Sequence, residues 1–487
     1  MVWAVSALQT GREGQASRFL RYPSEAATSD ISSKYAMHPW KLETLVNELL
    51  AQPKAQIRQG KNRRLNCQFF EAIASVNHAL TKLEDAEDGL TLQRVDVLRE
   101  MHRLIQRQLE WQVGRGANAQ RLYRSGYIYG GQKAQAFFAE KNKLTVNEFS
   151  FACLMLRSLY EKNPIIHNTG GMESIGISKE ALDATFDLIT IPHPAARDKA
   201  RTLRSPPGHV SYKRSLLREY PCISFDLHNR HALAPLVELL VLRSTTGLFY
   251  DMIKGGSDIR NEIASRYECY SYELLTEMLP SYEVNQSYEY SLRKGFPSNS
   301  PDVMVSDHAG ISLIFECKAT RMSYEARFSE NPVVDAARGY EEIAKGVFQI
   351  WKFVSHHRRG ILPTSSINTD AKGVVLTLDP WLSMARPMKE DVLQIARRIC
   401  AEKDPDITSA DHIPIIFCPI EELEFTLLDA TERSFFDAIQ AASRKDFDGW
   451  QLSGVHREIA PNRTERRLYP FRDRIGEVWP WWDSIDI

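Results

Sequence analysis

The chain has 487 residues, of which 43% are hydrophobic and 25% are charged, and its formal net charge is -1. This composition is typical of a folded globular protein and excludes an intrinsically disordered chain, while the length predicts two or three domains rather than one core. A nearly neutral chain gives no global electrostatic argument for a nucleic-acid partner, so any positive charge that binds such a partner must be local.

The seven cysteines are scattered, and none of them forms a C-x-x-C pair. This usage indicates a reducing compartment and argues against a disulfide framework or a structural zinc site. The first residues lack the cationic start and the apolar stretch of a signal peptide, and no run approaches the roughly 20 apolar residues that a membrane span needs. We therefore expect a cytoplasmic protein with no membrane partner.

Residues 1–35 are small and polar with weak patterning, which predicts a loose N-terminal arm. Residues 36–254 carry apolar side chains at helical spacing, which predicts a mainly α-helical domain for recognition or for binding a partner protein. The helical segments are 38–52, 94–112, 145–164 and 229–244, the last with an internal proline.

Two features of this helical domain have both a functional and a structural interpretation. The segment 197–219 is rich in Arg and Lys around a Pro-Pro-Gly turn. It is either a phosphate-contacting patch or, as we favour, a solvated loop with charged helix ends. His228 and His231 are candidates for a metal site or a nuclease site, but no third ligand is near them in the sequence, which favours histidines at a helix end.

Gly255 and Gly256 mark a linker, after which residues 255–487 predict an α/β domain. A helix over 257–280 precedes strands over 282–292, 301–306 and 311–319, a helix over 332–354, and strands over 373–382 and 413–420. This order describes a sheet with helices packed against it. The tail contains three tryptophans, which either cap the core, as we favour, or contact a partner.

The charged residues near the end of the second hairpin strand are the main functional candidates. Successive side chains of a strand point to opposite faces, so Glu316 and Lys318 share one face while Cys317 points to the other. Counting back from the turn places Asp302 near the position facing Ile314, one pair from Glu316. Such charges are costly in a core unless they are paired or hold a metal.

Two carboxylates at this position can hold Mg²⁺ through oxygen ligands, with the backbone carbonyl of Cys317 as a further ligand. Lys318 can orient the attacking water or stabilise the developing negative charge. This constellation suits the hydrolysis of a phosphodiester bond. The alternative is a structural Glu-Lys pair at a strand end, with Asp302 in a turn.

Pro301-Asp302, followed by Glu316-Cys317-Lys318, resembles the motif of the PD-(D/E)xK nuclease superfamily, and the resemblance covers roughly residues 258–420. It implies a restriction-endonuclease-like fold, in which a mixed sheet is flanked by helices and metal is held at one edge. It also implies that Asp302 and Glu316 bind Mg²⁺ or Mn²⁺ and that Lys318 is catalytic.

Many members of that superfamily add a glutamate from the helix before the first core strand. The stretch RYECYSYELL resembles this helix and assigns the role to Glu268, with Glu262 and Glu273 as rivals. Some branches also have a Gln with a Tyr four residues later. Gln349 matches the first position, where it would reach the attacking water or a substrate phosphate, but Phe353 stands at the second. Otherwise Gln349 is a polar residue on an outer helix face.

Tyr340, Lys345 and Lys352 lie on the same predicted helix and are surface candidates. The basic cluster at 356–359 either contacts a DNA backbone or is a solvated helix end. A nucleotide-binding loop of the form G-x-x-x-x-G-K-[ST] is absent from the sequence, so any motor activity would belong to another chain.

The sequence thus predicts a metal-dependent nuclease, with DNA as the favoured nucleic-acid partner and Mg²⁺ or Mn²⁺ as cofactor. The architecture is similar to that of bacterial phage-defence or mobile-element proteins, and a homodimer is compatible with cutting two strands. The alternative is a catalytically silent nuclease-fold module that binds nucleic acid or a partner protein.

Overall fold

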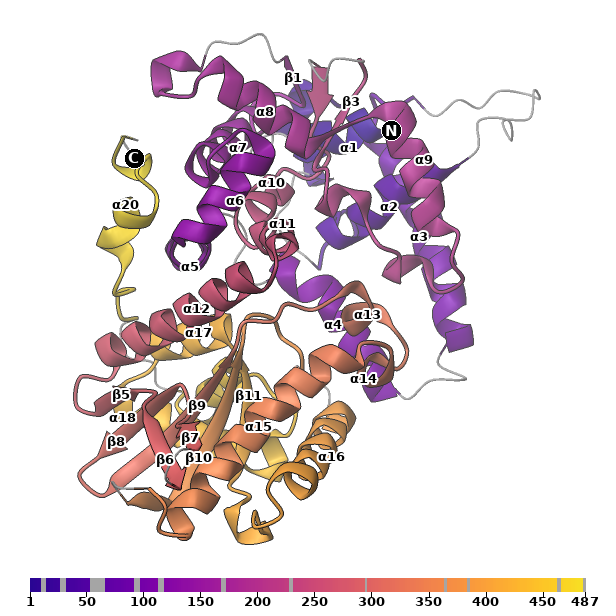
Figure 1. The fold of residues 1–487 in the computed structure, drawn as a ribbon. Coiled ribbons are helices and arrows are strands. Elements are labelled where there is room, and N and C mark those ends of the chain that lie inside the picture. Colours follow the sequence, from indigo (N-terminus) through magenta and orange to yellow (C-terminus); the bar gives the residue numbers. More distant parts are fainter. Residues whose placement is uncertain are drawn as a thin grey trace. The chain divides into compact units, whose positions relative to one another are not determined.

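The computed structural model describes residues 1–9, 15–26, 32–52, 66–91, 97–112, 118–167, 172–226, 231–293, 296–362, 366–382, 386–461 and 466–484. The chain, coloured along its sequence in Figure 1, divides into two compact units. Unit 1 comprises Met1–Arg94, Arg107–Gly256 and Gly476–Ile487, and unit 2 comprises Val95–Gln106 and Ser257–Ile475. In the described part of the chain, every helix is too short or too polar to cross a lipid bilayer.

Unit 1 is built mainly from helices. They are α1 (Val2–Gln9), α2 (Pro39–Ala51), α3 (Phe70–Thr91), α5 (Ala119–Tyr129), α6 (Gln132–Asn142), α7 (Val146–Tyr160), α8 (Lys179–Ile189), α9 (His193–Arg204), α10 (Glu238–Ser244) and α11 (Leu248–Met252). Helix α7 illustrates how local sequence sets a boundary, because Thr145 and Glu148 form a capping box at its first turn. Apolar side chains of α1, α2 and α9 meet in one core.

The first residues are not the loose arm that their composition predicts. Helix α1 places Ala4, Val5 and Ala7 in the core of unit 1, where they are completely buried. The prediction is wrong because this short segment is apolar on most sides. It therefore lacks the one-sided helical period by which a sequence pattern identifies a surface helix.

Unit 1 also contains a small four-stranded sheet, which the sequence did not predict. Its strands are β1 (Ile165–His167), β2 (Thr190–Pro192), β3 (Cys222–Ser224) and β4 (His231–Leu233), in the order β1-β4-β3-β2. The helix predicted over 229–244 is therefore wrong in its first half, and α10 begins only at Glu238, after Pro235. Strands of three residues are too short for a two-residue period to be recognised.

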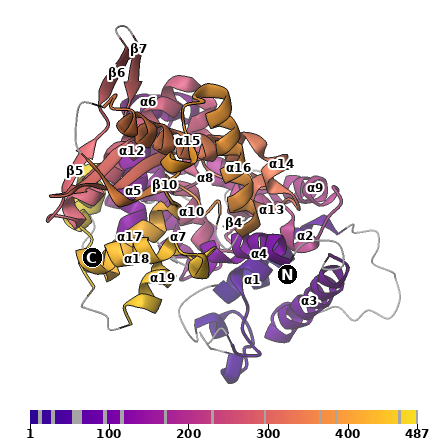
Figure 2. The ribbon, with the colours of Figure 1, turned by 90° about the horizontal axis from the view of Figure 1, so that it is seen from below.

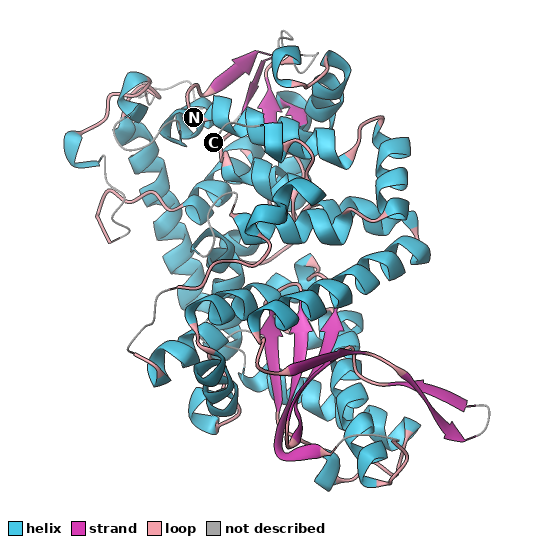
Figure 3. Ribbon diagram, turned by 90° about the vertical axis from the view of Figure 1, so that its left-hand side faces the viewer, coloured by secondary structure: helices cyan, strands magenta, loops and turns pink. Residues whose placement is uncertain are grey.

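Unit 2 has a mixed five-stranded sheet in the order β11-β10-β9-β8-β5. Strands β5 (Glu283–Gln286), β8 (Val303–Asp307) and β9 (Gly310–Lys318) are antiparallel, whereas β9, β10 (Ile367–Thr377) and β11 (Ile415–Pro419) are parallel. The expected α/β class is thus confirmed. The single strand predicted over 282–292 is divided: β6 (Glu289–Arg293) leaves the sheet and pairs with β7 (Phe296–Asn299) in a separate ribbon, visible in Figure 3.

The helices of unit 2 are α12 (Ser257–Met278), α13 (Tyr324–Phe328), α14 (Pro332–Asp335), α15 (Ala337–Arg358), α16 (Arg386–Lys403), α17 (Ile420–Asp429), α18 (Glu432–Ala442) and α19 (Leu452–Ile459). The boundary between the units falls within α4 (Val97–Gln112) and at the start of α20 (Ile475–Val478). Both α12 and α15 contact β9, and α15 and α16 lie side by side (Figures 1 and 2). Ile343, Val347 and Ile350 on the apolar face of α15 join Val375 of β10 in the core.

Trp479 and Trp481 of the tail are buried and Trp482 is partly buried, as expected for a cap on a core, but the core is that of unit 1. Trp479 Nε1 donates a hydrogen bond to the carbonyl of Leu122 at 2.7 Å. Trp481 stacks on Phe151 with the ring centroids 5.4 Å apart. The predicted domain 255–487 therefore includes terminal residues that belong to unit 1.

Candidate active site

The ends of β8 and β9 bring two acidic residues to neighbouring positions. Val303 pairs with Phe315, and continuing this register places Asp302, just before β8, opposite Glu316. The sequence predicted that Asp302 faces Ile314, which is wrong by two residues. The turn between the strands is tighter than assumed, and a bulge in the β8–β9 pairing shifts the register further.

The carboxylate of Asp302 is held by the backbone of β9. Its Oδ2 accepts a hydrogen bond from the amide of Cys317 at 2.7 Å. Burial raises the pKa of Asp302, and the Cys317 amide and the Lys318 ammonium offset part of that rise. This hydrogen bond fixes the direction of the carboxylate and engages one of its two oxygens.

Lys318 connects Glu316 to helix α15. Its Nζ lies 2.9 Å from Glu316 Oε1 and donates to Gln349 Oε1 at 2.7 Å. Gly346 makes room for this contact, because a Cβ at that position would lie 3.0 Å from Lys318 Cε and 3.3 Å from Glu316 Cγ. Sequence reasoning missed Gly346, although a glycine inside a helical pattern is itself a signal of close packing.

Glu316 is almost completely buried, with 1% of its surface exposed. Its second oxygen, Oε2, accepts no hydrogen bond from any residue that the structure describes. Burial raises the pKa of Glu316 to about 8; the Lys318 ammonium opposes this rise, and the charges of Asp302 and Glu268 add to it. The cluster thus holds more negative charge than one ammonium compensates.

Helix α12 contributes Glu268, which is half-buried. Burial, followed by the charge of Asp302, raises the pKa of Glu268 to about 7. Of its two rivals, Glu273 forms an ion pair with Arg474 at 3.7 Å, and Glu262 lies nearly two turns earlier on α12. Glu268 is therefore the acidic residue of this helix that belongs with the cluster.

The thiol of Cys317 points toward α12, where Ser271 lies beside it. Burial raises the pKa of this thiol well above its usual value, so the thiol is neutral and a poor metal ligand. Strand alternation predicts this orientation. If Cys317 contributes a metal ligand, as predicted, that ligand is its backbone carbonyl.

The remaining candidates on α15 lie in different environments. Tyr340 is completely buried on the apolar face of the helix, so the surface position expected for it is wrong. Lys345 is partly exposed and forms an ion pair with Glu342 at 2.6 Å. Lys352 is half-buried, and its ammonium donates to Ser298 Oγ of β7 at 3.0 Å.

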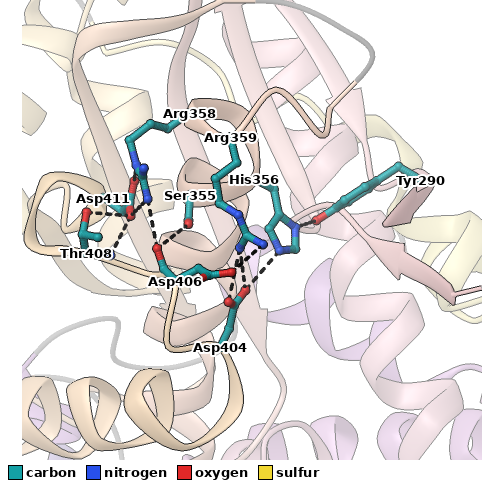
Figure 4. A network of polar contacts seen from close by, with 9 residues as sticks. All are labelled: Tyr290, Ser355, His356, Arg358, Arg359, Asp404, Asp406, Thr408 and Asp411. Carbon is teal, nitrogen blue, oxygen red and sulfur yellow. Dashed lines mark hydrogen bonds and ion pairs between the residues drawn. The ribbon is translucent and has the colours of Figure 1, made fainter. Parts of the chain in front are cut away.

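Both arginines of the basic cluster at 356–359 are paired with aspartates within unit 2, as Figure 4 shows. Arg358 makes two hydrogen bonds to Asp411, at 2.6 and 2.9 Å, and Arg359 pairs with Asp404 at 3.2 Å. His356 is buried beside them. These contacts hold the loop after α16 against the end of α15. The arginines of the cluster stand at an exposed helix end, as expected for a solvated terminus, and their charges are paired there with aspartates.

The basic segment 197–219 also pairs its charges with acidic side chains. The ion pairs are Lys199–Glu219, Arg201–Asp198, Arg204–Glu48 and Arg218–Glu43. Such pairing within unit 1 agrees with the structural interpretation of the segment.

Of the two histidines considered as metal or nuclease residues, only His231 is among the described residues, and it does not stand at a helix end. His231 is the first residue of β4, and its Nδ1 lies 3.1 Å from Asp226 Oδ2. His228 lies outside the described residues.

Across the described ranges, no three His, Cys, Asp or Glu side chains are grouped closely enough to form a metal site by themselves. In the cluster, the Lys318 ammonium engages one oxygen of Glu316, and the Cys317 amide engages one oxygen of Asp302. No protein-family model, curated protein or solved structure matches this chain. The functional argument therefore depends on the chemistry of the site itself.

Proposed function

We propose that the protein is a metal-dependent nuclease that hydrolyses phosphodiester bonds, with DNA as the favoured substrate. One observation carries the proposal: Asp302, Glu316 and Lys318 meet at the ends of adjacent strands, where Glu316 has a buried oxygen that no described residue engages. A purely structural Glu-Lys pair does not account for the two further carboxylates, because their charges make the burial of Glu316 less favourable.

The donor groups suit Mg²⁺ or Mn²⁺, since both ions prefer carboxylate oxygens. Because these carboxylates are not grouped closely enough to form a metal site by themselves, the ion would have to draw together Asp302, Glu316 and Glu268, with the carbonyl of Cys317. A divalent cation would offset the burial that raises the pKa values of all three carboxylates and the repulsion that adds to the rise for Glu268 and Glu316. When bound, it would polarise the scissile phosphate and lower the pKa of the attacking water.

Lys318 supplies a positive charge at a fixed position. Burial disfavours its ammonium form, but the charge of Glu316 outweighs burial and raises the pKa of Lys318. Lys318 therefore stays protonated at neutral pH and suits the stabilisation of developing negative charge rather than the acceptance of a proton. Gln349 accepts a hydrogen bond from the same ammonium and fixes its direction.

Within this proposal, unit 2 has a restriction-endonuclease-like fold. The supporting features are its mixed sheet, the position of the cluster at the ends of β8 and β9, and the helices α12 and α15 that contact β9. Unit 1 would then serve recognition or the binding of a partner protein.

A cleavage assay tests the proposal. Wild-type protein is incubated with duplex DNA, single-stranded DNA and RNA in Mg²⁺, Mn²⁺ or EDTA, beside Asp302→Asn and Lys318→Met. The matched control is Lys345→Met, on the same helix as Gln349 but outside the cluster. We expect a loss of about a hundredfold or more in both site variants, no loss in the control, and no cleavage in EDTA.

Cleavage that persists in both site variants would refute the assignment of activity to this cluster. A wild-type protein that binds nucleic acid but does not cut it in either metal would instead support the second candidate, a catalytically silent binding module.

A further inference from the structure

Among the described residues, two lysines of α15 and α16 have no acidic partner, unlike most basic residues around them. The nearby Arg358 and Arg359 are both paired with aspartates (Figure 4). By contrast, no carboxylate of the described residues lies within ion-pair distance of Lys352 or Lys403. Even Asp404, the neighbour of Lys403 in sequence, is engaged by Arg359.

Lys352 is close to the cluster. It follows Gln349 by three residues on α15, an advance of about 4.5 Å along the helix axis, and among the described residues it hydrogen-bonds the neutral Ser298 alone. Burial lowers the pKa of Lys352, and the more distant negative charges of Glu316 and Asp404 act in the opposite sense. A half-buried ammonium with only a hydroxyl as partner is left poorly compensated.

Lys403 and Phe348 complete this group. The Nζ atoms of Lys352 and Lys403 each lie 5.9 Å from the centroid of the Phe348 ring, and the two ammonium groups are close enough to repel each other. The position of Lys403 at the end of α16 favours a positive charge there, but that effect does not account for Lys352. An anionic ligand such as a phosphate would relieve the repulsion between these two like charges.

We infer that Lys352 and Lys403, arranged around Phe348, bind the phosphate backbone of a nucleic-acid strand that reaches the candidate active site. The inference rests on the proposed nuclease function and identifies where its substrate is held. Lys352 lies about one helical turn from Gln349, which accepts a hydrogen bond from Lys318. A strand whose scissile phosphate is at Lys318 would therefore present a nearby phosphate to Lys352.

The test is the salt dependence of nucleic-acid binding, measured in EDTA by the fluorescence anisotropy of a labelled oligonucleotide. The double variant Lys352→Gln/Lys403→Gln is compared with Lys345→Gln/Lys389→Gln. The control pair removes the same charge from the same two helices, but its lysines are paired with Glu342 and Asp448.

Each lost phosphate contact reduces the slope of log K against log salt by about 0.7 to 0.9. We expect the slope to fall by about 1.5 in the double variant, and to be unchanged in the control pair. Lys352→Arg, which keeps the charge, should retain the wild-type slope. Equal slopes in the double variant and wild type, an equal decrease in the control pair, or a wild-type protein that binds no nucleic acid would each overturn the inference.

This experiment separates the inference from the proposed function because binding in EDTA requires no cleavage. The expected change in slope, found in a protein that never cuts in Mg²⁺ or Mn²⁺, would reject the nuclease and retain the phosphate site. Cleavage combined with an unchanged slope would reject the phosphate site alone.

Discussion

Replacing Glu316 with glutamine should flatten the pH dependence of the stability of unit 2 in the metal-free protein. Burial raises the pKa of Glu316 from 4.5 to about 8. Between these values the folded state keeps a proton that the unfolded state has released, so the free energy of unfolding falls as the pH rises. The contribution of the protonated Glu316 to stability is fully present below its pKa in the unfolded state and is lost as the pH rises to its pKa in the folded state. Glutamine does not titrate, so the variant lacks this pH dependence.

The magnitude follows from the shift itself. At 1.36 kcal/mol for each pKa unit, Glu316 should reduce the free energy of unfolding by about 4 kcal/mol between about pH 5 and about pH 9. Glu268, whose pKa is about 7, adds a smaller loss in the same direction. Lys318 titrates above this window because the charge of Glu316 outweighs burial, so its titration does not cancel the effect.

The assay is urea unfolding in EDTA at a series of pH values, followed by tryptophan fluorescence and hydrogen exchange. Wild type should lose about 4 kcal/mol more than Glu316→Gln across the series. The matched control is Glu342→Gln on α15, whose carboxylate is partly exposed and paired with Lys345, and it should follow the wild-type profile. Parallel profiles for wild type and Glu316→Gln would refute the argument that Glu316 carries an uncompensated charge.

Gly346→Ala should lower cleavage by about a hundredfold with little change in stability, because its Cβ would lie 3.0 Å from Lys318 Cε and shift the ammonium, while alanine favours the helix. The control is Gly454→Ala on α19, where an added Cβ would lie 3.7 Å from its nearest neighbour, and it should leave cleavage unchanged. Equal activities in wild type and Gly346→Ala would contradict the packing argument. Asp411→Ala should destabilise unit 2 by about 3 kcal/mol, measured by urea unfolding, because the residue is completely buried and accepts two hydrogen bonds from Arg358. A loss below about 1 kcal/mol would show that this pairing contributes little.

The candidate cluster could be predicted from the sequence because its main residues lie on two strands that are adjacent in the sequence. Strand alternation places Glu316 and Lys318 on one face, and a short hairpin brings Asp302 back to them. The register of β8 and β9 could not be predicted, because the bulge and the tight turn depend on how the two strands pack rather than on the spacing of apolar residues. Local patterns thus identified the partners of the cluster but not their register.

Other features were missed because they depend on contacts between distant segments. Helix α1 is buried on most sides, so it shows no amphipathic pattern, and the three-residue strands of unit 1 are too short to show a period. The sequence also could not predict that Arg358 pairs with Asp411 while Lys352 hydrogen-bonds a serine. A run of charged residues looks the same in a sequence whether or not acidic side chains pair with it in the fold.

The most direct test of the central claim is the binding of Mn²⁺, measured from the electron paramagnetic resonance signal of the free ion as protein is added. We predict that wild type binds Mn²⁺, that Asp302→Asn and Glu316→Gln each weaken binding by about tenfold or more, and that Glu342→Gln has no effect. An affinity for Mn²⁺ that is the same in wild type and both site variants, or an absence of binding in wild type, would contradict a metal-dependent hydrolase at the ends of β8 and β9.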